Sequence, residues 1–162
     1  MNNRPKRKQN RLKDFDYNQT GAYFITICAK NHAELFGNVI ADEVPKVELS
    51  PIGKIVESEI TKLSSTYSNV GVDHNIIMPN HIHMIIVIRE DNSHNTAAPV
   101  ISQMINQWKR AVSIKAGCSP WQKSFHDHVI RNEADYRRIA EYIANNPATW
   151  ENDCHYVHPP AF

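Results

Sequence analysis

Apolar and polar residues alternate along the chain in patterns that predict four strands. Residues 22–30 (AYFITICAK) are rich in aromatic and β-branched residues and predict the first strand. Residues 70–78 and 81–88 predict two further strands, and because only Pro79 and Asn80 separate them, these should pair antiparallel through a tight turn. Residues 124–131 (SFHDHVIR) predict a short fourth strand.

Three segments have apolar residues at helical spacing. They cover residues 50–67, 100–117 and 132–147. Their ends carry the expected signals, namely Ser50 and Asn132 as N-caps, Pro51 at a first helical position, Gly117 after a last turn, and Pro147 as a stop.

The order of these elements predicts the fold class. Strand, helix, strand, strand, helix and strand is the order of an α+β, ferredoxin-like split βαβ (RRM-like) fold, in which two helices cover one face of an antiparallel sheet. The segment 34–50 predicts a hairpin insertion with Pro45 near its middle. The additional C-terminal helix should then pack on the open face of the sheet. We expect an arm over residues 1–20 and a single domain over residues 21–162.

Composition narrows the class of protein. The chain has 162 residues, of which 41% are hydrophobic, enough for one core. The longest wholly apolar run has five residues (MIIVI), far short of the roughly 20 that a membrane-spanning helix needs. The three cysteines are scattered and form no CxxC pair, so a disulfide framework is not expected. These features predict a cytoplasmic protein without a membrane segment.

The formal net charge of +1 hides an uneven distribution. Six of the 18 Lys and Arg residues precede the first acidic residue, Asp14, and the remaining 12 are outnumbered by 17 acidic residues. The N-terminal arm is therefore basic and the body acidic. Such an arm is typical either of a solvated tail or of a segment that binds phosphates. The basic residues of the arm are Arg4, Lys6, Arg7, Lys8, Arg11 and Lys13.

Two pairs of histidines have a spacing suited to metal binding. His81 and His83 open an apolar strand, and because side chains alternate along a strand, both should project from the same face. His126 and His128 repeat this spacing. Spacing alone cannot choose between the pairs. Imidazoles at the start of a buried strand need partners for their nitrogens, which favours His81 and His83 as ligands over a purely structural role.

The third helix carries a second set of candidate groups. Tyr136, Ile139 and Ile143 share a narrow stripe that should face the core. Tyr142 and Asn146 lie together on a flank of that stripe. If this flank faces the histidine pair, two imidazoles and an amide oxygen could hold a divalent metal beside a nucleophilic hydroxyl. A tyrosine at the rim of the core is the alternative.

These motifs together resemble a known family. The segments MPNHIHMII and WQKSFHDHVIRNEADYRRIAEYIANNP, with YNQTGAYFITIC and ELFG nearer the N-terminus, are similar to the REP-associated tyrosine transposases. These are relatives of the single-tyrosine HUH insertion-sequence transposases, which are named for a histidine-hydrophobic-histidine motif. The resemblance covers most of the chain.

The resemblance implies a role for four residues. His81 and His83 match the metal-binding histidines, and Tyr142 matches the nucleophile. Asn146 takes the place of the third ligand, which is a glutamine in many insertion-sequence relatives. The metal would be Mg²⁺ or Mn²⁺, although imidazole donors also suit Ni²⁺ or Zn²⁺.

The resemblance also implies the reaction and its substrate. Tyr142 would cleave and rejoin single-stranded DNA beside a hairpin through a 5′-phosphotyrosine intermediate. The chain would be a monomer or a homodimer. The basic arm would contact the DNA, together with basic residues of the second and third helices and of the segment before the third: Lys109, Arg110, Arg131, Arg137 and Arg138. His126 and His128 then become packing or DNA-contact residues.

Two other functions remain open from the sequence. One is a domesticated protein that binds hairpin DNA without cutting it. The other is a metal-binding or interaction protein without a nucleic-acid role, which would show little salt-dependent affinity for single strands.

Overall fold

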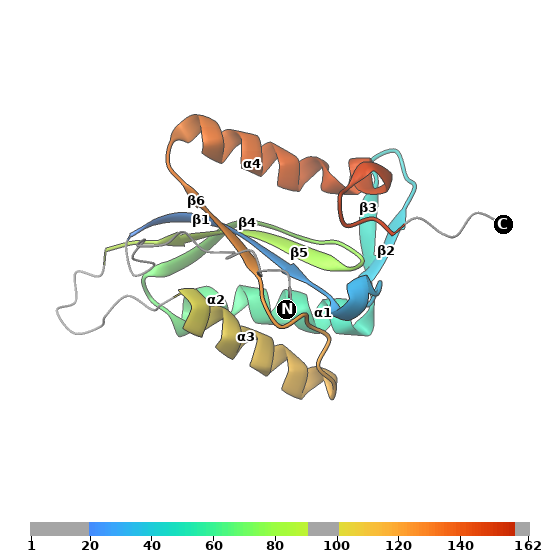
Figure 1. Cartoon of the computed structure of the whole chain (residues 1–162), viewed down its shortest axis with the longest axis horizontal. Helices are drawn as coiled ribbons and strands as arrows, with labels where there is room; N and C mark the ends of the chain where they lie inside the picture. Colours follow the sequence, from blue (N-terminus) through green and yellow to red (C-terminus); the bar gives the residue numbers. More distant parts are fainter. Residues whose placement is uncertain (1–19, 91–100, 158–162) are drawn as a thin grey trace, which may run out of the picture.

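A four-stranded antiparallel sheet forms the centre of the molecule (Figure 1). The computed structural model describes residues 20–90 and 101–157. Along the sheet the strand order is β4 (Val70–Ile77), β5 (His81–Ile88), β1 (Gly21–Cys28) and β6 (His126–Ile130). With the inserted hairpin set aside, this is the order of the split βαβ arrangement, so the α+β ferredoxin-like prediction is confirmed.

Helices cover both faces of this sheet. Helices α1 (Pro51–Thr61), α2 (Leu63–Thr66) and α3 (Ile101–Ala116) lie on one face, and α4 (Glu133–Asn145) crosses the other, where the sequence placed the additional helix (Figure 1). A short 3₁₀ segment, η2 (Asn146–Asn152), continues from α4. None of the described helices is long and apolar enough to cross a membrane.

The two faces of the sheet differ in their chemistry. The face beneath α1 and α3 is filled by a large apolar cluster, whereas the face beneath α4 carries a small one. Polar side chains can therefore occupy the rest of the α4 face without disrupting the main core. The small cluster consists of Ile85, Ile130, Ile139 and Ile143, with Tyr136 and Ala140 packed against it.

The predicted signals at the helix ends are present. Ser50 Oγ accepts a hydrogen bond from the backbone N–H of Gly53 at 3.0 Å, and Asn132 Oδ1 accepts one from Asp135 N–H at 2.9 Å. Gly117 follows α3 with φ of +66°, a conformation that glycine adopts without strain. The segment 50–67 differs from the prediction in one respect, because a break at Lys62 divides it into α1 and α2.

The inserted hairpin, β2 (Gly37–Ile40) and β3 (Lys46–Leu49), packs closely against the start of α1. A Cβ atom at Gly53 would lie 2.0 Å from the carbonyl oxygen of Phe36, so only glycine fits in this helical position. The predicted first strand, 22–30, ends at Cys28. Beyond it, η1 (Lys30–His32) contains Asn31 and His32 with φ of 58° and 53°.

Candidate metal and nucleophile site

Two buried histidines line the α4 face of the sheet. His81 and His83 lie on β5, with side-chain exposures of 0% and 2%. Their ring centroids are 4.5 Å apart, because residues two apart on a strand project from the same face. In the pairing of β5 with β1, Cys28 lies opposite His81 and Thr26 opposite His83.

Hydrogen bonds fix the orientation of both imidazoles. His81 Nδ1 lies 2.9 Å from Asn80 Oδ1, which can only accept, so the Nδ1–H donates. Nε2 of His81 is then left with its lone pair, buried and without a partner among the described residues. His83 Nδ1 lies 2.9 Å from Thr26 Oγ1. Outer hydrogen bonds of this kind orient histidines that ligate metals.

Helix α4 brings its tyrosine to the same place. The hydroxyl of Tyr142 lies 3.3 Å from His83 Nε2, and the two ring centroids are 5.2 Å apart. Tyr142 is 38% exposed, whereas Asn146, one turn later, is fully buried. The flank predicted from helical periodicity therefore faces the histidine pair.

Asp153, which the sequence reasoning missed, completes the cluster. Its Oδ2 accepts hydrogen bonds from the Tyr142 hydroxyl at 2.9 Å and from Asn146 Nδ2 at 2.8 Å. Its Oδ1 accepts from the backbone N–H of His155 at 2.8 Å. The only signal in the sequence was the density of polar groups in the segment ENDCH (151–155), which has neither helical nor strand periodicity.

The surroundings shift the pKa values of these groups strongly. Burial, reinforced by neighbouring imidazoles, lowers the pKa of His81 to about 3 and that of His83 to about 2, so both are neutral and can offer lone pairs. Burial and the Asp153 carboxylate raise the pKa of Tyr142. Burial opposes ionisation of Asp153 as well, but its hydrogen bonds from His155, Asn146 and Tyr142 lower its pKa overall.

The donor set suits a divalent cation. One ligand atom from each of His81, His83 and Asp153 lies within 4.8 Å of the others. Asn146 adds a carbonyl oxygen, Oδ1, that is buried and has no hydrogen-bond partner in the described part of the chain. Two neutral imidazole nitrogens, a carboxylate and an amide oxygen can together bind a divalent first-row metal.

Comparisons with known proteins give one full-length relative and one partial match to a transposase. No family model matches the chain. A protein of Haemophilus influenzae without an assigned function is 33% identical over 93% of both chains. A REP-associated tyrosine transposase of Escherichia coli K12 is 31% identical over 44% of this chain and 41% of its own length. The chain belongs to the same family as the Haemophilus influenzae protein, and part of it is similar to a REP-associated tyrosine transposase.

One solved structure has a similar fold. It is described as a REP-associated tyrosine transposase bound to a REP hairpin, and it superposes with a TM-score of 0.63 at 22% identity. The match covers 86% of this chain and 74% of the other. This likeness shows that the two proteins share the arrangement of sheet and helices.

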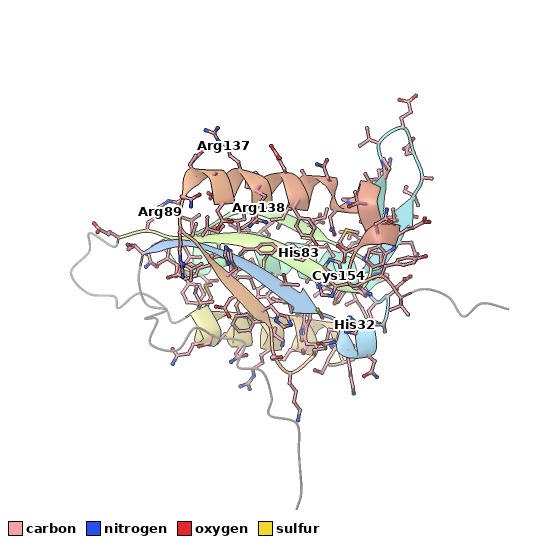
Figure 2. All side chains as sticks on the ribbon, turned by 45° about the horizontal axis from the view of Figure 1, so that its top comes forward. His32, His83, Arg89, Arg137, Arg138 and Cys154 are labelled. Atoms are coloured by element: carbon pink, nitrogen blue, oxygen red, sulfur yellow. The ribbon has the colours of Figure 1, made fainter. Side chains whose placement is uncertain are left out.

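The basic residues predicted to contact DNA are not gathered on one surface. Arg110 is exposed on α3, while Arg131, Arg137 and Arg138 are exposed beside or on α4, across the sheet from α3 (Figures 1 and 2). Lys109 is buried, and its ammonium group donates to the carbonyl oxygen of Gln122 at 2.6 Å. The six basic residues of the arm lie outside the described residues.

The two histidines of the second pair, His126 and His128, lie in different surroundings. His128 lies on β6, where its Nε2 is 2.7 Å from Asp135 Oδ2, and Arg138 donates to the other oxygen of that carboxylate at 2.5 Å. His128 and Arg138 line the same cavity as Tyr142 and His83. His126 does not line this cavity. The cavity is lined by Phe24, Thr26, His83, His128, Arg138, Ile139, Tyr142, Cys154 and His155.

Proposed function

We propose that this chain is a metal-dependent transposase that cleaves and rejoins single-stranded DNA through Tyr142. The observation that carries the proposal is the distance of 3.3 Å between the Tyr142 hydroxyl and His83 Nε2, within one chain. A phenol oxygen so close to two neutral, buried imidazoles is the arrangement that a metal-assisted tyrosine nucleophile requires. Since all these groups come from one chain, the site is consistent with a monomer.

His81 and His83 would bind the metal through their Nε2 atoms, with Asn146 Oδ1 and Asp153 as the oxygen donors. The orphaned nitrogen of His81 and the orphaned oxygen of Asn146 support this assignment. When bound, Mg²⁺ or Mn²⁺ would polarise the scissile phosphate and offset the charge that develops on its oxygens. The proposed set mixes nitrogen and oxygen donors, which suits Mn²⁺ better than Mg²⁺.

Tyr142 would attack the phosphorus atom of the scissile phosphodiester. A bond forms between the phenol oxygen and phosphorus, the bond from phosphorus to the 3′ oxygen breaks, and the 3′ oxygen leaves as a hydroxyl after taking a proton from water. Asp153, which accepts the hydrogen bond of the phenol at 2.9 Å, would receive the phenol proton. A second 3′-hydroxyl can attack the 5′-phosphotyrosine and reverse the sequence, so no nucleotide cofactor is needed.

Hairpin DNA is the substrate that the family supports. The related solved structure is described as bound to a REP hairpin, and we propose the same class of ligand for this chain. Arg138 and His128, at the rim of the cavity, can contact phosphates next to the scissile bond. Arg131, Arg137 and the basic arm would add contacts outside the cavity, whereas Lys109 is left out because its ammonium group is engaged inside the protein.

The test is covalent capture of DNA. A hairpin oligonucleotide labelled at its 3′ end is incubated with the protein and Mn²⁺, and a labelled protein adduct is expected. Tyr142→Phe should abolish the adduct, whereas Tyr136→Phe, on the same helix but hydrogen-bonded to Asp73 at 3.1 Å, should retain it. Equal adduct formation by Tyr142→Phe would refute the proposed nucleophile. Tight hairpin binding without an adduct in any divalent metal would instead support a domesticated binding protein.

A further inference from the structure

A second group of metal-binding side chains lies at the end of β1. Cys28 is the last residue of β1, His32 ends η1, and His155 follows η2. One ligand atom from each lies within 4.8 Å of the other two. Figure 2 shows His32 at the end of the sheet, apart from His83, which lies beneath α4. Two segments that are far apart in the sequence, residues 28–32 and the residues after η2, therefore bring a thiol and two imidazoles together.

The spacing of two of these donors matches a zinc site. Cys28 Sγ and His155 Nδ1 are 3.7 Å apart. Tetrahedral Zn²⁺ with its usual bond lengths holds a sulfur and a nitrogen ligand about 3.6 Å apart. A hydrogen bond from the thiol to the imidazole has a similar length, so this distance alone does not distinguish a zinc site from a hydrogen bond. The third side chain of the group, His32, provides the distinction.

His32 has a buried ring nitrogen that no hydrogen bond from the described residues satisfies. Its Nε2 lies 3.0 Å from the amide nitrogen of Gln122, but its Nδ1 is buried and has no hydrogen-bond partner among the described residues. Buried polar nitrogens rarely lack a hydrogen-bond partner. If the Gln122 amide turns over, its oxygen accepts the Nε2–H of His32, and Nδ1 then presents a lone pair. A histidine that ligates a metal typically donates its other ring N–H to an oxygen acceptor.

One side chain holds this group in place. Asn80 Nδ2 donates to the carbonyl oxygens of His32 at 3.3 Å and His155 at 2.8 Å. The Oδ1 of the same amide accepts from His81. Asn80 is fully buried, and its hydrogen bonds position His32 and His155 of this group as well as His81 of the site around Tyr142. His32 is held at a φ of 53°, which non-glycine residues adopt infrequently.

We propose that Cys28, His32 and His155 form a second metal site, selective for Zn²⁺. A thiolate with two imidazoles favours Zn²⁺ over Mg²⁺ or Mn²⁺, and water would take the fourth position. Binding forms a bond between zinc and sulfur and releases the thiol proton of Cys28 to solvent. Because burial raises the pKa of Cys28 to about 11, the side chain remains a thiol until a cation binds.

The second site would act on the first through the chain between them. Asp153 contacts Tyr142, and His155 contacts Cys28. Bound Zn²⁺ would therefore hold the segment 153–155, which includes Asp153, against the end of β1. The two sites adjoin, because the ring centroids of His155 and His81 are 4.5 Å apart and His155 also lines the cavity beside Tyr142. The proposal is nevertheless separate from DNA cleavage, since it concerns a cation bound by a different set of ligands. An inactive transposase could bind Zn²⁺ here, and an active one could lack the site.

Cobalt absorption tests the site directly. Co²⁺ is titrated into the full-length protein, and one equivalent should give the near-ultraviolet absorption band of sulfur-to-cobalt charge transfer. The site around Tyr142 cannot produce this band, because its proposed ligands contain no sulfur. Zn²⁺ should displace the band. Cys28→Ser should abolish it, while the matched controls Cys118→Ser and Cys154→Ser should keep it. His32→Gln should weaken Zn²⁺ binding by at least ~10-fold.

Several results would overturn the proposal. These are absence of the band in the wild-type protein, persistence of the band in Cys28→Ser, or its loss in Cys154→Ser, which would move the sulfur ligand to an exposed residue. Far-ultraviolet circular dichroism checks that Cys28→Ser is folded. If that variant does not fold, His32→Gln decides, because His32 is partly exposed and lies outside the core cluster. Unchanged Zn²⁺ affinity in His32→Gln would refute the site.

Discussion

Asp153 is the residue with the strongest control over Tyr142. Its carboxylate accepts the phenol hydrogen bond and is second only to burial in raising the Tyr142 pKa. In Asp153→Asn, we expect the pKa of Tyr142 to fall, because a negative neighbour is removed. We also expect adduct formation with hairpin DNA to slow by about 100-fold, because the proton acceptor is lost.

Two measurements check these opposite effects. The pKa of Tyr142 is followed by a pH titration of the tyrosine ring resonances, with Tyr142→Phe to assign the signal. The rate of adduct formation is followed in Mn²⁺, with the nearby exposed Glu151→Gln as the control for charge. A variant that cleaves at the wild-type rate would show that Asp153 does not accept the phenol proton.

Buried neutral imidazoles should make the metal-free protein sensitive to acid. The pKa values of His81 and His83 lie far below the value of about 6.5 expected for an unfolded chain. Below pH 6.5 the unfolded state therefore takes up protons that the folded state does not. Each histidine should cost about 2 kcal/mol of unfolding free energy by pH 5, and stability should recover above pH 6.5.

Urea unfolding in the presence of a chelator measures this dependence. The wild-type protein should lose stability between pH 7.5 and pH 5, and His83→Leu should lose about 2 kcal/mol less over the same interval. His126→Gln, at an exposed position, should keep the wild-type dependence. If His83→Leu and the wild-type protein have the same pH dependence, His83 is not held neutral by its burial.

Residues of the site differed in how far the sequence could predict them. Strand alternation placed His81 and His83 on one face, and helical periodicity placed Tyr142 and Asn146 on one flank, because both patterns depend only on local geometry. Asp153 and His155 follow the kinked η2. Tertiary contacts decide the path of such a segment. The proximity of Asp153 to Tyr142 and of His155 to Cys28 therefore could not be predicted from residue spacing.

Helix α4 is the element on which the tyrosine site depends. It is attached to the sheet through a small apolar cluster that includes Ile139 and Ile143, both nearly fully buried. In Ile143→Ala we expect a loss of about 2–5 kcal/mol, because a cavity opens where the cluster has few other members. Adduct formation should fall as well, because the helix no longer holds Tyr142 at His83.

Chemical denaturation and adduct assays of the same preparations check this prediction. Glu141→Ala is the matched control, since it lies two residues away on the exposed side of α4. It should change the unfolding free energy by less than about 0.5 kcal/mol and leave the adduct unchanged. Equal effects of the two substitutions would mean that packing of α4 does not position the tyrosine.

The elements themselves were largely predictable because their signals are local. Caps at Ser50 and Asn132 and the short turn before His81 gave the ends of helices and strands. The break at Lys62 was not predicted, since the apolar spacing continues through it to Leu63. The early end of the first strand was also missed. There the left-handed residues of η1 turn the chain away from the sheet, and neither Asn31 nor His32 signals this as a glycine would.

On the scale of the whole molecule, charge is divided between the arm and the body. Residues 1–13 contain six basic residues, whereas the rest of the chain has 12 basic and 17 acidic residues. An acidic body repels DNA at long range, so the arm should supply much of the nonspecific affinity. Each phosphate neutralised on a single strand contributes about 0.7 to the slope of log affinity against log salt concentration.

Deletion of residues 1–13 should therefore weaken hairpin binding and flatten its salt dependence. If all six charges contact phosphates, the slope should fall by about 4, and proportionally less if fewer do. The measurement is fluorescence anisotropy of a labelled hairpin across a salt series. A full-length variant with the six basic residues changed to Gln separates charge from chain length and should match the deletion. Because Tyr142 and the histidines are untouched, adduct formation at saturating DNA should persist in both variants. An unchanged slope would show that the arm is a solvated tail and that the DNA is held by the body alone.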